Sequence, residues 1–212
     1  MQRSLALATC VLSWYISAQA QPPRLSGGEP PRIGDWVTLD WWTPMQSVSG
    51  LLNADDLEDI AVILERTQDT PEEKTFERGD RALLILYGTE SGGWRQGAMV
   101  PGMLPCSNCS DAAGSGEEAT ILDLSIADDR VLEIAWLLRN GSTQAVRLFI
   151  GWDDTQERLG LIADDVIRIQ PVTGERNRVR RDYRAGKMWA DGAPSAMRPR
   201  FIPIDELATD AY

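Results

Sequence analysis

The chain has 212 residues, no histidine and a formal net charge of −11 at pH 7. The missing histidine excludes Ser-His-Asp and Cys-His nucleophile chemistry, histidine-ligated metal sites and a histidine general base. The acidic balance also argues against a nucleic-acid partner, because the overall field repels phosphate.

Residues 1–20 have the pattern of a secretory signal peptide. Arg3 is their only charge, residues 5–16 are an apolar run, and Ala18-Gln19-Ala20 is a small-x-small cleavage site. The run is too short to be a permanent membrane span. We therefore expect no stable membrane insertion and a periplasmic or secreted protein that begins at Gln21, with a net charge of −12 because one arginine and no acid is removed.

The rest of the chain predicts an all-β fold. Residues 21–33 are a Pro-rich irregular arm, and short apolar segments then alternate with turn residues at a spacing of about 8–12 residues. Asn140-Gly141 between two such segments indicates a hairpin. We expect one antiparallel domain over residues 34–206, arranged as a meander, a sandwich or propeller-like hairpins, and a tail at 207–212. The expected strands are 34–42, 60–65, 81–87, 94–99, 119–126, 131–138, 144–150, 158–163, 166–170 and 176–183.

Residues 50–64 are an acidic turn that leads into an apolar strand. Three side chains occupy positions 3, 5 and 9 of a calcium-loop pattern: Asn53, Asp55 and Asp59. Leu51 stands at the first position, where Asp is usual, and Asp56 replaces the glycine of position 6. Two interpretations follow, either a weak, vestigial calcium site or a metal-free turn in which Asn53 and Asp55 bond their own backbone. No other cofactor is expected. The apolar run that follows predicts a strand buried on both faces.

Cys106 and Cys109 are the only cysteines after residue 20, and they lie among Pro, Ser, Gly and Asp. In an oxidising compartment such a pair predicts a small local disulfide. A closed zinc site would need two more strong ligands. A redox role would need a helix start to lower the thiol pKa, and the surrounding composition predicts a loop instead.

Charge is unevenly distributed along the chain. Residues 168–200 contain nine basic residues against three acids, whereas residues 21–167 contain 11 basic and 26 acidic residues. The densest basic patch consists of Arg176, Arg178, Arg180, Arg181 and Arg184. Either the two regions form a strong dipole, or the basic strand pairs beside an acidic one and is neutralised within the sheet.

Three pairs of adjacent acids are candidates for carboxylate chemistry, which needs two acids at a defined separation. These pairs are Asp128/Asp129, Asp153/Asp154 and Asp164/Asp165, and each is predicted at a turn, where Asp is common for conformational reasons. Trp136 lies inside an apolar run and is predicted to belong to the core. Trp41 and Trp42 would point to opposite faces of an extended segment.

Residues 53–64 resemble the aspartate-rich turn and strand of FG-GAP/VCBS-type segments. They are more closely similar to the start of a bacterial exported family of unknown function. The later motifs of that family have counterparts at residues 159–165 and 182–187, so the resemblance spans about residues 48–190. It implies export and a β-rich domain, and it implies no catalytic residues.

These features favour an exported, non-enzymatic interaction protein of the bacterial envelope with a protein partner. An alternative is an acidic inhibitor or immunity protein that masks a basic hydrolase or toxin, because opposite charge favours such an encounter. A third hypothesis is a carboxylate-based hydrolase. The oligomeric state is open.

Overall fold

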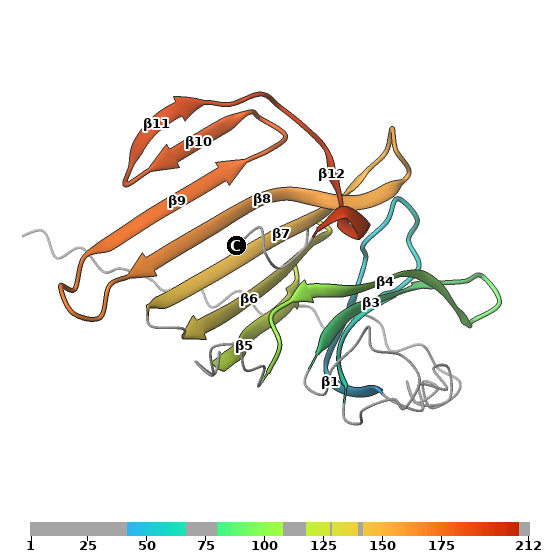
Figure 1. The fold of residues 1–212 in the computed structure, drawn as a ribbon. Coiled ribbons are helices and arrows are strands. Elements are labelled where there is room, and N and C mark those ends of the chain that lie inside the picture. Colours follow the sequence, from blue (N-terminus) through green and yellow to red (C-terminus); the bar gives the residue numbers. More distant parts are fainter. Residues whose placement is uncertain (1–41, 67–79, 108–117, 128, 140–141, 208–212) are drawn as a thin grey trace, which may run out of the picture. The chain divides into compact units, whose positions relative to one another are not determined.

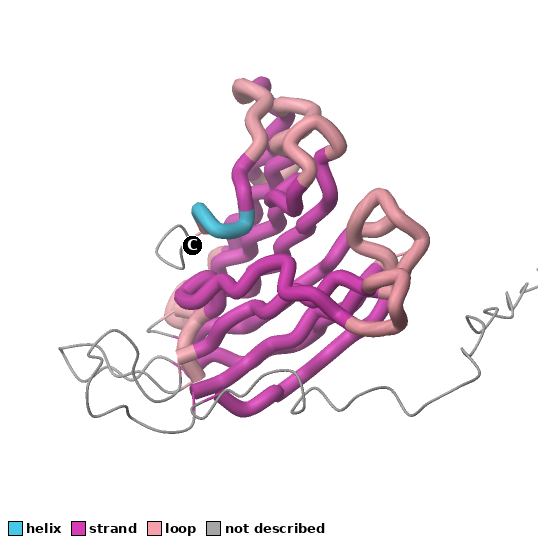
Figure 2. The backbone as a smooth tube through the Cα atoms, turned by 90° about the vertical axis from the view of Figure 1, so that its right-hand side faces the viewer, coloured by secondary structure: helices cyan, strands magenta, loops and turns pink. Residues whose placement is uncertain are grey.

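The computed structural model describes residues 42–66, 80–107, 118–127, 129–139 and 142–207 (Figure 1). The chain divides into two units, residues 1–36 and 37–212, and every described residue belongs to the second. The described chain consists of strands and loops with one short 3-10 helix, η1 (Ile204–Glu206), which confirms the all-β prediction (Figure 2). In these ranges no helix is long and apolar enough to cross a membrane.

The first four strands form an antiparallel sheet in the order β1-β2-β3-β4. They are β1 (Trp42–Gly50), β2 (Asp59–Arg66), β3 (Arg81–Gly88) and β4 (Trp94–Leu104). As predicted, β2 is buried on both faces along most of its length, and so is β3, for which the sequence predicted only a strand. Most of the predicted strand 34–42 lies outside the described residues, and β1 begins where that prediction ended.

The strand predicted at residues 94–99 is longer than expected, because the first residues of the predicted loop that follows it belong to the strand. Strand β4 continues to Leu104, which pairs with Arg81, while Pro101 pairs with Ala82 across a register shift. A proline is compatible with this position because β4 is an edge strand of its sheet.

The remaining strands form an eight-stranded antiparallel sheet. Its main path runs β11-β10-β9-β8-β7-β6-β5, and β12 pairs with β8. The strands are β5 (Glu118–Ile126), β6 (Val131–Arg139), β7 (Thr143–Asp153), β8 (Arg158–Ile169), β9 (Arg176–Asp182), β10 (Lys187–Ala190), β11 (Ala193–Ala196) and β12 (Ile202–Pro203). The prediction of two strands at 158–163 and 166–170 was wrong, since β8 is continuous.

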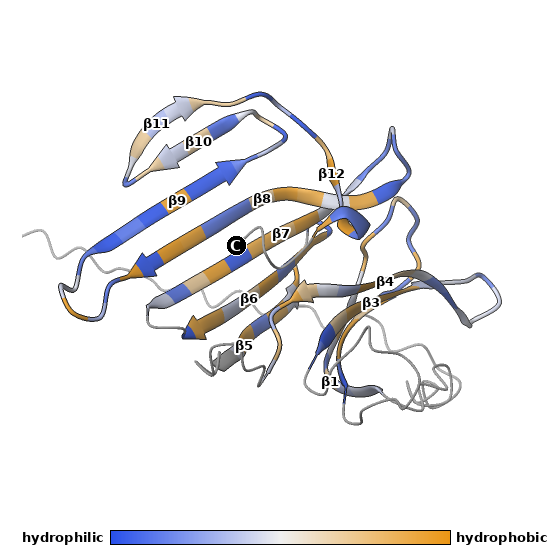
Figure 3. Ribbon diagram, viewed as in Figure 1, coloured by the Kyte–Doolittle hydropathy of each residue, from blue (hydrophilic) through white to orange (hydrophobic). Residues whose placement is uncertain are grey.

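One hydrophobic core joins residues of both sheets. Alternate side chains of β6 and β7 enter it, among them Leu132, Ile134 and Leu148, which are fully buried. Trp136 is 1% exposed, which confirms its predicted place in the core. The C-terminal segment closes this core, because η1 contacts both β4 and β8. The other side of the large sheet carries charged and polar residues between apolar ones, as alternating hydropathy along its strands indicates (Figure 3).

Because the strands are antiparallel, the hairpin turns of the large sheet alternate between two ends. Turns 127–130, 153–157 and 183–186 lie at one end, which we call the acidic end. Turns 170–175 and 191–192, the start of β5 at Glu118 and the neighbouring ends of β6 and β7, Arg139 and Thr143, lie at the other, which we call the opposite end.

Candidate functional site

Asp59, the first residue of β2, anchors the acidic turn between β1 and β2, and its side chain is 0% exposed. One carboxylate oxygen, Oδ2, accepts hydrogen bonds from the backbone N–H groups of Leu52 (2.8 Å) and Asn53 (3.2 Å). The other, Oδ1, accepts from the N–H of Gly88 at the end of β3 (3.0 Å). Burial raises the pKa of Asp59 above its ordinary value, and these three hydrogen bonds oppose the shift. Asp59 therefore ties the turn to the sheet instead of presenting its oxygens to a cation.

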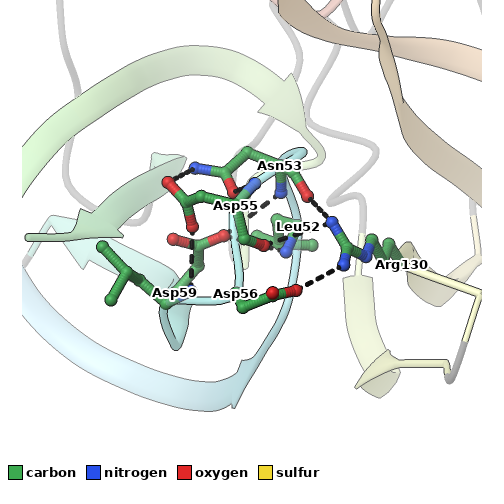
Figure 4. A network of polar contacts seen from close by, with 7 residues as sticks. Leu52, Asn53, Asp55, Asp56, Asp59 and Arg130 are labelled. Carbon is green, nitrogen blue, oxygen red and sulfur yellow. Dashed lines mark hydrogen bonds and ion pairs between the residues drawn. The ribbon is translucent and has the colours of Figure 1, made fainter.

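Asn53 and Asp55 close the turn on its own backbone (Figure 4). The N–H of Asp55 donates to Asn53 Oδ1 (3.0 Å), and the N–H of Leu57 donates to Asp55 Oδ1 (2.9 Å). The interpretation of a self-bonded turn is thus confirmed. Asn53 Nδ2 also donates to Asp55 Oδ2 (2.9 Å), so a donor occupies the place where a calcium loop would gather oxygens. Within the described ranges, no group of three acidic or cysteine side chains is arranged to hold a metal ion.

Arg130 holds this turn against the large sheet. It was not among the candidate residues predicted from the sequence. Its Nη1 donates to the carbonyl oxygens of Asn53 (2.5 Å) and Asp55 (3.2 Å), and its Nη2 pairs with Asp56 Oδ1 at 3.0 Å (Figure 4). Arg130 adopts a φ of 63°, which is uncommon for a residue with a side chain. The sequence feature that could have pointed to Arg130 is its position as a single cation directly after two aspartates in a predicted turn.

A pocket of about 330 Å³ opens beside the arginine. Four separate segments contribute its lining, which comprises Asn53, Ala54, Asp129, Arg130, Val131, Gly151, Trp152, Asp154 and Arg184. Arg184 reaches across from the β9–β10 turn and donates to the carbonyl oxygen of Trp152. A Cβ at Gly151 would lie 3.5 Å from Arg184 Nη2 and 3.2 Å from Ile162 Cδ1, so glycine leaves room for both side chains.

Exposed acids belong to the turns that line this pocket, and two of them, Asp129 and Asp154, are part of its lining. They come from the acidic turn and from the turns at the acidic end of the large sheet: Asp55, Asp56, Glu58, Asp129, Asp154 and Glu157. Arg130 is charge-paired with Asp56, which leaves Arg184 as the cation of the lining that pairs with no described carboxylate. The pocket therefore has donors and acceptors in its walls and a negative rim.

The five predicted basic residues do not form one patch. Arg178 pairs with Asp165 and Arg181 with Asp164, so the expectation that the basic strand is neutralised within the sheet is confirmed for these two. Arg180 lies over the ring of Trp189 (5.7 Å to its centroid), and Arg184 belongs to the pocket. Arg176 is exposed at the opposite end.

The predicted turn at Asp164 and Asp165 was wrong, because both lie inside β8 on opposite faces. Asp164 is 0% exposed; its Oδ1 accepts from Arg181 Nε (2.8 Å) and its Oδ2 accepts from the hydroxyl of Tyr183 (2.9 Å). Partners on β9 and just beyond it thus satisfy a carboxylate that the sequence alone placed in a loop.

The other two acid pairs lie at or next to turns. Asp153 Oδ1 accepts from the N–H groups of Thr155 (3.0 Å) and Gln156 (2.9 Å), as a turn aspartate does. Asp129 belongs to the β5–β6 turn, and Asp128 lies outside the described residues.

Of the two cysteines in the predicted disulfide, one belongs to the described residues. Cys106 lies two residues after β4 and is half-buried, while Cys109 lies outside the described residues. Their pairing therefore stays a prediction.

Comparison with known proteins identifies no relative of this chain. No protein-family model matches the chain, and no match is found among the curated proteins or the solved structures. The resemblance of residues 48–190 to an exported family accordingly stays a prediction.

Proposed function

We propose that this protein is an exported, non-enzymatic binding protein of the bacterial envelope, and that it binds its partner at the acidic end. The observation that carries this proposal is the pocket, which residues from four separate segments line beside a turn held by Asp59 and Arg130. Loops fixed on a rigid sheet are the usual place for binding residues. The size of the pocket lies at the lower end of ligand sites, which suits one protruding side chain of a protein partner.

The buried carboxylates support a binding role more than a hydrolytic one. A carboxylate hydrolase needs two acids facing each other across a substrate. Asp164 and Asp165 point to opposite faces of β8, and each is paired with its own arginine. Asp59 is held by three backbone donors. These acids therefore stabilise the sheet and the turn.

The negative rim favours a basic partner. This supports the second candidate function, an inhibitor or immunity protein that masks a basic hydrolase or toxin. Complementary charge accelerates such an encounter and makes it depend on salt. The six exposed acids at the pocket are the specific observation in favour of this candidate.

Capture from envelope extract tests both statements. The wild-type protein should retain a basic protein, and Asp129→Lys with Asp154→Lys should abolish this capture, because the rim then repels a cation. Glu175→Lys is the matched control, since it reverses an exposed acid at the opposite end of the sheet. Equal capture by the wild type and the double variant would contradict binding at the acidic end.

A further inference from the structure

The pocket at the acidic end is lined by charged groups of both signs that do not neutralise one another. Arg130 is committed to the acidic turn, through an ion pair with Asp56 and hydrogen bonds to two carbonyl oxygens. Among the described residues, the carboxylates of Asp129 and Asp154 form no hydrogen bond or ion pair, and Arg184 pairs with no carboxylate. Two anions and one cation of the lining are therefore open to a ligand.

The register of β6 with β7 brings the two aspartates to the same place. Val131 pairs with Gly151, so Asp129 precedes this pair by two residues and Asp154 follows it by three on the neighbouring strand. The turns that carry them are fixed. Backbone hydrogen bonds close the β5–β6 turn, and Oδ1 of Asp153 accepts from two backbone N–H groups of the β7–β8 turn.

Arg184 is placed in the pocket by the turn between β9 and β10. In this turn the N–H of Ala185 donates to Asp182 Oδ1 (2.8 Å). Gly186 has a φ of 64°, and a Cβ there would lie 2.7 Å from a backbone carbonyl oxygen, so the turn requires glycine. The guanidinium of Arg184 donates to the carbonyl oxygen of Trp152, and most of its N–H donors stay available to a ligand.

We propose that the pocket binds a small zwitterion, a molecule with one ammonium and one carboxylate group, as in a free amino acid or a short peptide. The ligand carboxylate would pair with Arg184, because a guanidinium can donate two parallel hydrogen bonds to a carboxylate. The ligand ammonium would lie at Asp129 and Asp154. The volume of about 330 Å³ is at the lower end of ligand pockets, as a molecule of this size requires.

Arg184 determines the specificity in this arrangement. Asp129 and Asp154 alone would favour any cation, but Arg184 repels a ligand that carries only a positive charge. The exposed acids of the neighbouring turns likewise disfavour a ligand that carries only a negative charge. This inference goes beyond the proposed function, because it gives the same pocket a small ligand and requires no protein partner.

Amide chemical shifts in NMR titrations of the protein test the proposal. Glycine or glycylglycine should shift the amides of Gly151, Asp154 and Arg184 until saturation. The two differ in the separation of their charges, so the tighter binder shows whether the site fits an amino acid or a peptide. Glycinamide lacks the carboxylate and N-acetylglycine lacks the ammonium, so each should bind about tenfold more weakly, since one hydrogen-bonded charge is lost.

Variants assign the two charges to their residues. Arg184→Gln should bind the zwitterion about tenfold more weakly and lose the preference for it over glycinamide, and Asp154→Asn should lose the preference over N-acetylglycine. Arg176→Gln and Glu175→Gln are the matched controls, because they remove the same charges from exposed residues at the opposite end of the sheet. Both should bind as the wild type does, and denaturant unfolding should confirm that all variants are folded.

Glycinamide that binds as tightly as the zwitterion would overturn the proposal, because the pocket would then recognise a cation alone. Unchanged shifts at the pocket amides with every compound would overturn it as well. Neither result would contradict the proposed function, since the capture of a basic protein from envelope extract tests that function separately.

Discussion

At the scale of single residues, Asp59 is the side chain on which the pocket most depends. Asn at this position offers one acceptor oxygen and an NH2 group with two donors where three backbone N–H groups need acceptors. Asp59→Asn should therefore leave at least one buried donor unsatisfied and lower the free energy of unfolding by about 1–3 kcal/mol. Denaturant unfolding measures this. Asp56→Asn, at an exposed side chain of the same turn, should stay within about 0.5 kcal/mol of the wild type.

Two tyrosines should make the fold sensitive to alkaline pH. Burial, reinforced by the negative charge of Asp59, raises the pKa of Tyr87 to about 12, and burial also raises the pKa of Tyr183 beside Asp164. A pKa raised by folding stabilises the protein fully below the unfolded value near 10, and this contribution is lost as the pH rises through the folded pKa. Stability should thus fall between pH 10 and about 12.

Phenolate absorbance during an alkaline titration checks this prediction. The late ionisation should coincide with loss of structure, and Tyr87→Phe should remove one late-ionising group. Ionisation of all tyrosines near pH 10 in a protein that remains folded would contradict it.

At the scale of elements, the pairing of β8 with β9 depends on a buried carboxylate. Asp164→Ala would remove the carboxylate that accepts from Arg181, whose side chain is 27% exposed, and from the buried hydroxyl of Tyr183. We expect a loss near the lower end of the roughly 3–5 kcal/mol seen when one partner of a buried ion pair is removed. Asp165→Ala removes the neighbouring acid on the open face, whose partner Arg178 is half exposed, and surface ion pairs contribute only about 0–1 kcal/mol. Similar losses for the two variants, measured by denaturant unfolding, would argue against a special role for Asp164.

The acidic turn should need no calcium. Its amide and carboxylate groups are used by one another and by the backbone, and Arg130 already holds its carbonyl oxygens. Thermal melts in EDTA and in millimolar calcium should therefore coincide. A melting temperature raised by micromolar calcium, with Asp55→Ala abolishing the increase, would show that the turn binds the ion.

The sequence predicted what local patterns determine and missed what distant partners determine. The apolar run after Asp59 and the strands β3, β5 and β6 follow from hydropathy and turn residues. Strand β8 was split because Asp164-Asp165 resembles a turn, and the partners that keep it extended lie 17–19 residues away. Strands β10 to β12 are short and interrupted by Gly and Pro. Arg130 could not be identified because its contacts lie more than 70 residues earlier in the chain.

At the scale of the described fold, the antiparallel topology sorts the charges that the sequence shows only as a division along the chain. Hairpin turns alternate between the two ends of the large sheet, so acids from distant segments come together at the pocket, while the opposite end carries Arg139 and Arg176 together with Glu118, Glu175 and Asp191. Part of the basic strand is neutralised by β8. The acids gathered at the pocket are the basis of the proposed basic partner.

Hydrogen exchange on the complex with the captured partner tests the central claim, that binding occurs at the acidic end, most directly. Binding should slow exchange of the backbone amides at residues 51–56, 129–131, 151–154 and 184–186, and should leave those of residues 170–176 unchanged. Protection confined to the open face of β8 to β11, with the pocket segments unchanged, would contradict the account.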